Sequence, residues 1–446
     1  YREDWVFRVT YNYASRYFFE ANGAYNGSEK FGPDYRFAFF PSLSLGWMLT
    51  NEKFMENVEF LNTFKIRGSW GLIGDDNVSG RWLYADQWTY GGNAVMGPVP
   101  SNTPYTFYRI STLGNPFISW ETVEKRNIGV DYSFLRGKIS GSFDYFSDDR
   151  RDIIIGGNSR AIPSYFGVTA PSANLGRVKA NGYEFEIRLT HSFANGLRAW
   201  VNANFTHAKN KVIFRDSPQL LPAYQKTEGY PIGQTRAFLD YGFLTSWDDV
   251  YASTPRTSNN NNKLPGDFNI IDFNGDGVID DYDRAPYMYP SNPQNTYSPS
   301  LGIDWKGWNL FLQFYGVNNV TREVAFPTFH STSNVAYVEG TYWTVQRGGD
   351  IPYPRWSTIL GGEAVGTRYL YDGSYLRLKN AEIGYTISGK AINRLGVQKC
   401  KIYLNGSNLF LWTKMPDDRE SNFSGSSSFG AYPTLRRFNF GIDITL

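Results

Sequence analysis

The sequence predicts an all-β protein, an antiparallel β-barrel whose strands cross a lipid bilayer. Three observations predict it. First, apolar and polar residues alternate along extended runs. Second, these runs reach about ten or more residues. Third, short connections alternate with very long ones along the chain. Strands of soluble proteins usually span only about five or six residues, so the run length favours a transmembrane barrel. The pattern contains about 14 candidate strands.

The clearest alternation lies in a predicted hairpin around Asn195-Gly196. Every second residue of its two strands is apolar, and we expect these side chains to face lipid: Tyr183, Phe185, Ile187, Leu189, Ala199, Val201, Ala203 and Phe205. The residues between them are polar or charged, and we expect these to face the lumen: Glu184, Glu186, Arg188 and Asn202. A charged side chain on the lipid face would be strongly unfavourable, so a transmembrane barrel requires these charged residues to face the lumen.

The connections between the candidate strands fall into two lengths. Short links are expected at residues 135–138, 194–196 and 306–307, and long polar segments at about 74–119, 150–179, 210–237, 248–295, 319–373 and 414–435. Short turns on the inner side and long loops on the cell surface are typical of outer-membrane barrels. Alternation also occurs in soluble β-sandwiches, so a secreted carbohydrate-binding or hydrolytic β-protein stays an alternative.

Composition excludes several classes of protein. Charged residues make up only 19% of the chain and aromatic residues 17%, and no run approaches the roughly 18 apolar residues of a membrane helix. A net charge of +2 argues against a nucleic-acid partner. The single Cys400 excludes a disulfide framework. No nucleophile motif occurs, and the pairs Asp148-Asp149 and Asp248-Asp249 are interpreted as solvated loop charges, so no enzyme is expected.

One segment, 272–283, has the spacing of a calcium-binding loop. Oxygen-bearing side chains fall at loop positions one, three, five and nine, Gly277 falls at position six, and an aspartate closes position twelve. Carboxylates so close together would repel one another without a cation. We therefore predict a structural Ca²⁺ site in an extracellular loop, with six ligands: Asp272, Asn274, Asp276, Val278 through its carbonyl, Asp280 and Asp283. A solvated turn rich in Asp and Asn is the alternative.

Aromatic residues gather in two of the long segments. The first group is Trp82, Tyr84, Trp88 and Tyr90, and the second is Tyr337, Tyr342, Trp343, Tyr353 and Trp356. Sugar rings and peptides dock well on aromatic faces, but the same residues could pack within folded loops or form a membrane-interface girdle. These interpretations stay open, and no substrate residue is named.

Six short blocks follow one another along nearly the whole chain. They are residues 39–47 with Glu52 and Phe54, residues 64–71, Asn115-Pro116 with Trp120-Glu121, Asn174 and Gly176 with residues 181–184, residues 372–380 with Gly384-Tyr385, and Tyr403 with residues 406–410. This ordered set resembles the SusC/RagA group of TonB-dependent transporters of the bacterial outer membrane.

The resemblance implies a barrel of roughly 22 strands, plugged by an N-terminal domain that follows a TonB-contacting segment. Because the chain opens within a strand-like run, at residues 1–14, we expect residues 1–446 to be the C-terminal part of one barrel domain, without the plug and the first strands. Residues 5–14 and 436–446 should then not be hydrogen-bonded to each other, because an open edge in lipid needs other neighbours.

The resemblance also implies active import of oligosaccharides or peptides, a SusD-like surface lipoprotein as partner, and TonB contact through the missing segment. Outer-membrane lipid is the other expected partner. A passive porin-like channel of about 14 strands stays the alternative to active import.

Overall fold

The computed structural model describes residues 1–78, 80–93, 106–258, 260–323, 342–347, 353–355, 366–389, 392, 396–415 and 434–445. Two compact units make up the chain. One comprises Tyr1–Phe185, Ala208–Leu221 and Lys226–Ile232, and the other comprises Glu186–His207, Pro222–Gln225 and Gly233–Leu446. None of the helices in the described ranges has the length and apolar character needed to cross a membrane.

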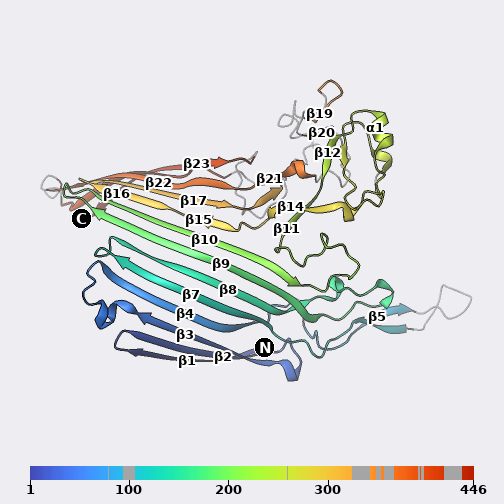
Figure 1. Cartoon of the computed structure of the whole chain (residues 1–446), viewed down its shortest axis with the longest axis horizontal. Helices are drawn as coiled ribbons and strands as arrows, with labels where there is room; N and C mark the ends of the chain where they lie inside the picture. Colours follow the sequence, from blue (N-terminus) through green and yellow to red (C-terminus); the bar gives the residue numbers. More distant parts are fainter. Residues whose placement is uncertain are drawn as a thin grey trace, which may run out of the picture. The chain divides into compact units, whose positions relative to one another are not determined.

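A sheet of 14 strands forms most of the structure. The strands are β1 (Arg2–Tyr13), β2 (Tyr17–Ser28), β3 (Phe37–Met48), β4 (Leu61–Asp75), β7 (Glu121–Phe134), β8 (Ile139–Ile155), β9 (Ala173–Ser192), β10 (Arg198–Phe214), β15 (Asn295–Tyr297), β16 (Ser300–Trp305), β17 (Trp308–Asn318), β22 (Tyr375–Ser388), β23 (Lys399–Thr413) and β24 (Arg437–Thr445). They follow one another in chain order, and β16 pairs with β10 and β17. Within the first unit, Figure 1 shows β1–β4, β7 and β8 as long neighbouring arrows.

The ladders are antiparallel, and their registers sort the side chains onto two faces. One row pairs Val9, Ala21, Leu43 and Trp70 across β1–β4, and the next row pairs Thr10, Glu20, Ser44 and Ser69. Apolar side chains of the first face are openly exposed, with Val9 at 57% and Leu43 at 45%. An apolar face that is exposed along whole strands fits contact with lipid, as the alternation predicted.

The strand order begins at β1 and ends at β24, and no ladder joins these two strands in the described part of the chain. Each of them pairs with one neighbour, β2 and β23 respectively.

Three predicted short links are confirmed as tight turns, at residues 135–138, 193–197 and 306–307 between consecutive strands. Each contains a glycine with positive φ, at Gly137 (78°), Gly196 (81°) and Gly307 (90°). The predicted hairpin at 183–205 is also confirmed, since β9 and β10 are continuous strands on either side of its turn. In that hairpin Tyr183 stacks on Phe143 of β8 with ring centroids 6.5 Å apart, so both rings lie on the apolar face.

Several strands extend further than the sequence predicted. Residues 150–155, 173–179 and 210–214 were expected in loops, but they continue β8, β9 and β10. Asp149, expected as a solvated loop charge, has a side chain only 13% exposed and lies within β8. The reason is that charged residues replace apolar ones at these strand ends, so the hydropathy pattern stops although the hydrogen-bonded ladder continues.

The long connections carry small sheets of their own. They are formed by β5 (Gln87–Asn93) with β6 (Thr106–Thr112), β11 (Gln234–Phe238) with β14 (Arg284–Pro290), β12 (Asp240–Phe243) with β13 (Phe268–Ile270), β18 (Thr321–Glu323) with β21 (Leu370–Asp372), and β19 (Tyr342–Trp343) with β20 (Tyr353–Arg355). The short helix α1 (Trp247–Ala252) begins at a capping box in which Ser246 and Asp249 exchange hydrogen bonds.

Candidate functional site

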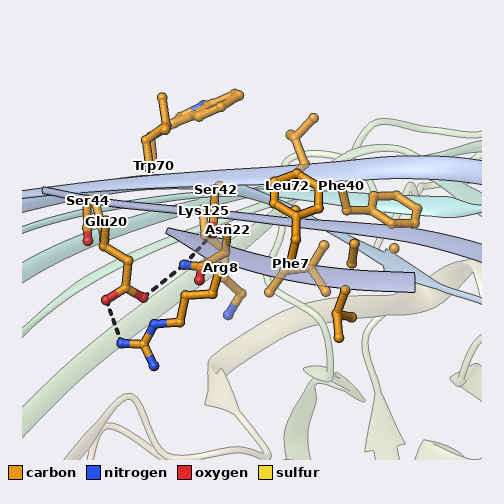
Figure 2. A pocket seen from close by; sticks show the side chains of 18 of the residues that line it. Phe7, Arg8, Glu20, Asn22, Phe40, Ser42, Ser44, Trp70, Leu72 and Lys125 are labelled. Atoms are coloured by element: carbon orange, nitrogen blue, oxygen red, sulfur yellow. Dashed lines mark hydrogen bonds and ion pairs between the residues drawn. The ribbon is translucent and has the colours of Figure 1, made fainter. Parts of the chain in front are cut away.

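The polar face of the first unit contains a cavity of ≈ 820 Å³ over β1–β4. Figure 2 shows Arg8, Glu20 and Asn22 on one side of the strands and Trp70 on the other. Arg8 lies 2.7 Å from the Glu20 carboxylate, and the Asn22 amide donates to the same carboxylate at 2.9 Å. These side chains come together because alternate residues of β1 and β2 point to the same face and their rungs are adjacent.

A second cavity of ≈ 530 Å³ continues along the same face and shares Glu20, Ser44 and Ser69 with the first. We call the charged, amide and hydroxyl residues Ser, Thr, Asn, Glu, Lys and Arg that line the two cavities the polar track: Arg2, Arg8, Thr10, Asn12, Glu20, Asn22, Asn26, Ser42, Ser44, Lys65, Arg67, Ser69, Lys125 and Asn127. A surface with both charges, hydroxyls and amides offers many hydrogen bonds to a polar solute or to a polar protein surface.

An ion cluster on the polar face ties three strands together. Arg67 of β4 donates two hydrogen bonds of 2.6 Å to Asp144 of β8, and its Nε lies 3.2 Å from Asp131 of β7. The guanidinium crosses over Gly129, where a Cβ would come within 2.7 Å of the Arg67 Cζ and 2.5 Å of an Asp144 oxygen. The bidentate geometry therefore depends on the lack of a side chain at residue 129.

Replacing Arg67 by alanine is expected to lower the free energy of unfolding of the complete protein by about 2 kcal/mol. The loss of the guanidinium leaves Asp131 and Asp144 facing each other without a cation, and partial exposure keeps the effect below that of a fully buried pair. Urea unfolding in lipid would measure it. Arg8→Ala is the matched control, because its pair with Glu20 is exposed and should contribute less than about 1 kcal/mol. Equal losses from the two variants would contradict the role of the cluster.

The predicted calcium loop lies in the second unit, on a folded loop region with its own apolar core. That core contains Phe238, Phe243, Phe268, Ile270, Ile279, Trp343 and Tyr369. Two backbone hydrogen bonds hold Ile279, which occupies loop position eight. Its N–H donates to the Pro255 carbonyl at 2.8 Å, and its carbonyl accepts from the Thr257 N–H at 3.0 Å. The loop is thereby anchored to a neighbouring segment of the same unit.

The loop folds around its own carboxylates. Asp272 accepts hydrogen bonds from the backbone N–H groups of Gly275 (2.7 Å) and Gly277 (2.8 Å), and both glycines have positive φ, 74° and 87°. Asp283 is fully buried and accepts from the N–H groups of Phe273 (2.7 Å) and Asp280 (2.8 Å). The glycine at position six thus adopts the conformation that the motif predicts.

Four of the predicted calcium ligands affect the pKa of one neighbouring side chain, Tyr224. Burial raises the pKa of the Tyr224 hydroxyl, and the carboxylates of Asp283, Asp276, Asp280 and Asp272 raise it further. That hydroxyl donates to the Tyr282 carbonyl at 2.6 Å. In the part of the chain that the structure describes, no three His, Cys, Asp or Glu side chains are grouped so that they could hold one metal ion. Calcium binding by this loop therefore stays a prediction.

The aromatic groups separate into exposed and buried members. Trp88 and Tyr90 are 64% and 54% exposed, whereas Trp343 is only 6% exposed and belongs to the loop core. Tyr84 packs against a second core that contains Trp120. Packing within folded loops therefore accounts for the burial of Trp343 and for the partial burial of Tyr84. Tyr337 and Trp356 lie outside the described residues.

Residues 3–409 match the family described as TonB dependent receptor-like, beta-barrel. The chain belongs to this family. The fold and the outer-membrane location that the alternation and the loop lengths predicted are therefore those of the family.

Curated relatives agree with this membership. The chain is 27% identical to TonB-dependent receptor P3 of Formosa agariphila, over 98% of this chain and 45% of the relative. It is 25% identical to TonB-dependent receptor SusC of Bacteroides thetaiotaomicron, over 98% of this chain and 43% of the relative.

The fold is similar to that of the RagAB peptide importer in its open-open state, with a TM-score of 0.76, 18% identity, and coverage of 100% of this chain and 47% of that chain. The chain spans about half the length of the relatives that it matches.

Proposed function

We propose that the complete protein imports oligosaccharides or peptides across the outer membrane by a TonB-dependent mechanism. The observation that carries the proposal is the family match over residues 3–409, on a wall whose polar face bears a continuous polar track. In this proposal the described strands form part of the conduit. A plug, the first strands and the TonB-contacting segment belong to sequence outside residues 1–446, which is consistent with coverage of about half of each relative.

Uptake measurements in the native host test this proposal. Deleting the gene should abolish uptake of either a labelled oligosaccharide pool or a labelled peptide pool, and the pool affected identifies the substrate class. Removing TonB should reduce the same uptake to the level of the gene deletion, because a plugged barrel needs energy to open. Uptake that persists without TonB would favour the passive porin-like channel, and unchanged uptake of both pools after gene deletion would refute import of these substrates.

We also propose a SusD-like surface lipoprotein as the partner of the complete protein. The similarity to TonB-dependent receptor SusC and to the RagAB peptide importer supports this proposal, because the resemblance to the SusC/RagA group implies such a partner. Affinity purification of the tagged, complete transporter from mild detergent should recover one lipoprotein in roughly equal amount. A transporter that purifies alone, while remaining active in uptake, would contradict the partnership.

The third component of the proposal is a structural Ca²⁺ ion in the loop 272–283. The support comes from the loop spacing, the positive φ of Gly277 and the four carboxylates that act on Tyr224. The ion would neutralise these carboxylates and fix the loop against the apolar core beside Ile279.

A further inference from the structure

A charged cluster lies on the apolar face of the first unit, at the strand ends beside the long connections. In the ladder between β7 and β8, Val130 pairs with Phe143 and Ile128 with Tyr145, and both rungs are apolar. The next rungs on this face pair Arg126 with Ser147, Glu124 with Asp149 and Thr122 with Arg151. The face therefore changes from apolar to charged within a few rungs, on continuous strands, as expected where a barrel leaves the hydrocarbon layer.

Two carboxylates at the centre of this cluster are covered by cations. Asp149 lies 2.6 Å from Arg177 and 2.9 Å from Arg151, and Arg151 also lies 2.9 Å from Glu124. Both carboxylate side chains are 13% exposed, whereas Arg126 is 65% and Lys179 is 54% exposed. The four cations Arg126, Arg151, Arg177 and Lys179 outnumber the two carboxylates by two. The cations are also the more exposed groups of the cluster.

Two further lysines extend the cluster onto β10. Lys209 and Lys211 lie on β10, which neighbours β9 in the sheet, and strand alternation places both on the same face of β10 as Phe205. Lys209 and Lys211 are exposed, and neither forms an ion pair with a described residue. A purely structural ion-pair network would leave no such excess of free positive charge.

Trp70 of β4 lies at the margin of the same cluster, where its indole donates to Glu124 at 3.0 Å. Tryptophan concentrates at the level of lipid head groups because its ring is apolar and its N–H is polar. This position places the cluster directly beyond the hydrocarbon layer, on the side of the long loops.

We propose that this outer basic patch binds phosphate groups of lipid in the outer leaflet of the membrane. The patch consists of Arg126, Arg151, Arg177, Lys179, Lys209 and Lys211. Guanidinium and ammonium groups bind phosphate oxygens strongly, and basic residues next to a membrane attract anionic head groups. The occupant is a lipid because the patch continues the apolar face without a break, so one molecule can place its chains on Ile128 and Tyr145 and its phosphates on the cations.

Binding of lipid A to the purified, complete transporter in detergent tests the proposal. The variant is Lys179→Gln with Lys211→Gln, which removes only the longest of the Asp149 ion pairs, at 3.9 Å from Lys179, and leaves the closer contacts of Arg151 and Arg177 in place. The control is Arg136→Gln with Lys138→Gln, an equal charge change in the short turn at the opposite strand ends. The probes are bisphosphorylated lipid A and the same lipid after removal of its phosphates.

Wild-type protein should bind the phosphorylated form at least ten-fold more tightly than the dephosphorylated form. The variant should lose roughly thirty-fold in affinity for the phosphorylated form, and the control should stay within about two-fold of wild type. Wild-type binding that ignores the phosphates, or a variant that binds like wild type, would overturn the proposal. So would release of lipid A by millimolar inorganic phosphate, which would indicate a site for free anions. If the double variant does not fold, Lys211→Glu alone should still weaken binding.

Discussion

The paired substitutions Phe143→Arg and Tyr183→Arg are expected to prevent stable insertion of the complete barrel. Both rings lie on the apolar face of β8 and β9, 44% and 40% exposed, and they stack on each other at 6.5 Å. An arginine near the middle of the bilayer costs about 2–4 kcal/mol on the lipid face of a barrel, so two cost about 4–8 kcal/mol. That loss is comparable to the whole folding stability of many proteins.

The matched control is Ser142→Arg with Glu184→Arg, which places two arginines on the neighbouring positions of the same strands but on the opposite, polar face. Outer-membrane fractions are compared for folded protein, and urea unfolding in lipid gives the free energy. We expect near wild-type insertion for the control. If the two double variants insert equally well, then the apolar face of the sheet is not the face that contacts lipid.

The short turns were predictable because local chemistry determines them. Gly137, Gly196 and Gly307 all adopt positive φ, which favours glycine, and each lies between two alternating runs. The first hairpin gave no such signal. Its turn holds Ala14 and Ser15 at positive φ, 51° and 53°, where Asn12 accepts a hydrogen bond from the Ser15 N–H. Non-glycine residues in that conformation are uncommon, so sequence alone extended the first strand through Ala14.

The folded loops were not predictable, because their core residues are far apart in sequence. Phe243, Phe268 and Tyr369 pack in one core although 126 residues separate the first from the last. Alternation and helical periodicity describe neighbours along the chain and carry no information on such contacts. For the same reason the loop aromatics could not be divided in advance into exposed residues such as Trp88 and core residues such as Trp343.

The blocks that carried the family resemblance have structural tasks in this fold. The Trp47 indole donates to Glu52 at 3.1 Å, and the Tyr17 hydroxyl donates to the same carboxylate at 2.6 Å, so this block ties the ends of β2 and β3 to the next turn. Asn174 accepts from the Ser119 N–H at 2.9 Å and donates to the Ser119 carbonyl at 2.8 Å, which joins the start of β9 to the connection before β7. The blocks therefore identify the scaffold, and they do not identify the substrate.

Calcium is expected to bind the complete transporter and to protect the loop 272–283, and Asp276→Ala is expected to abolish both effects. At about one hundred times its dissociation constant, Ca²⁺ would stabilise the bound loop by about 2.7 kcal/mol. Asp276 holds loop position five, and it already accepts a hydrogen bond from the Val278 N–H at 2.9 Å, so its carboxylate faces the interior of the loop. Calorimetry with Ca²⁺ measures the binding, and hydrogen exchange of the loop measures the protection.

Asp281→Ala is the matched control for this experiment. It removes the same charge from the same loop, but the Asp281 side chain is 93% exposed and falls outside the ligand positions of the motif. A general effect of negative charge would weaken calcium binding equally in the two variants, whereas coordination by the loop predicts a loss only for Asp276→Ala. Equal heats from wild type and Asp276→Ala would show that the twelve-residue spacing describes a solvated turn, whose carboxylates are satisfied by backbone N–H groups such as those of Gly275 and Gly277.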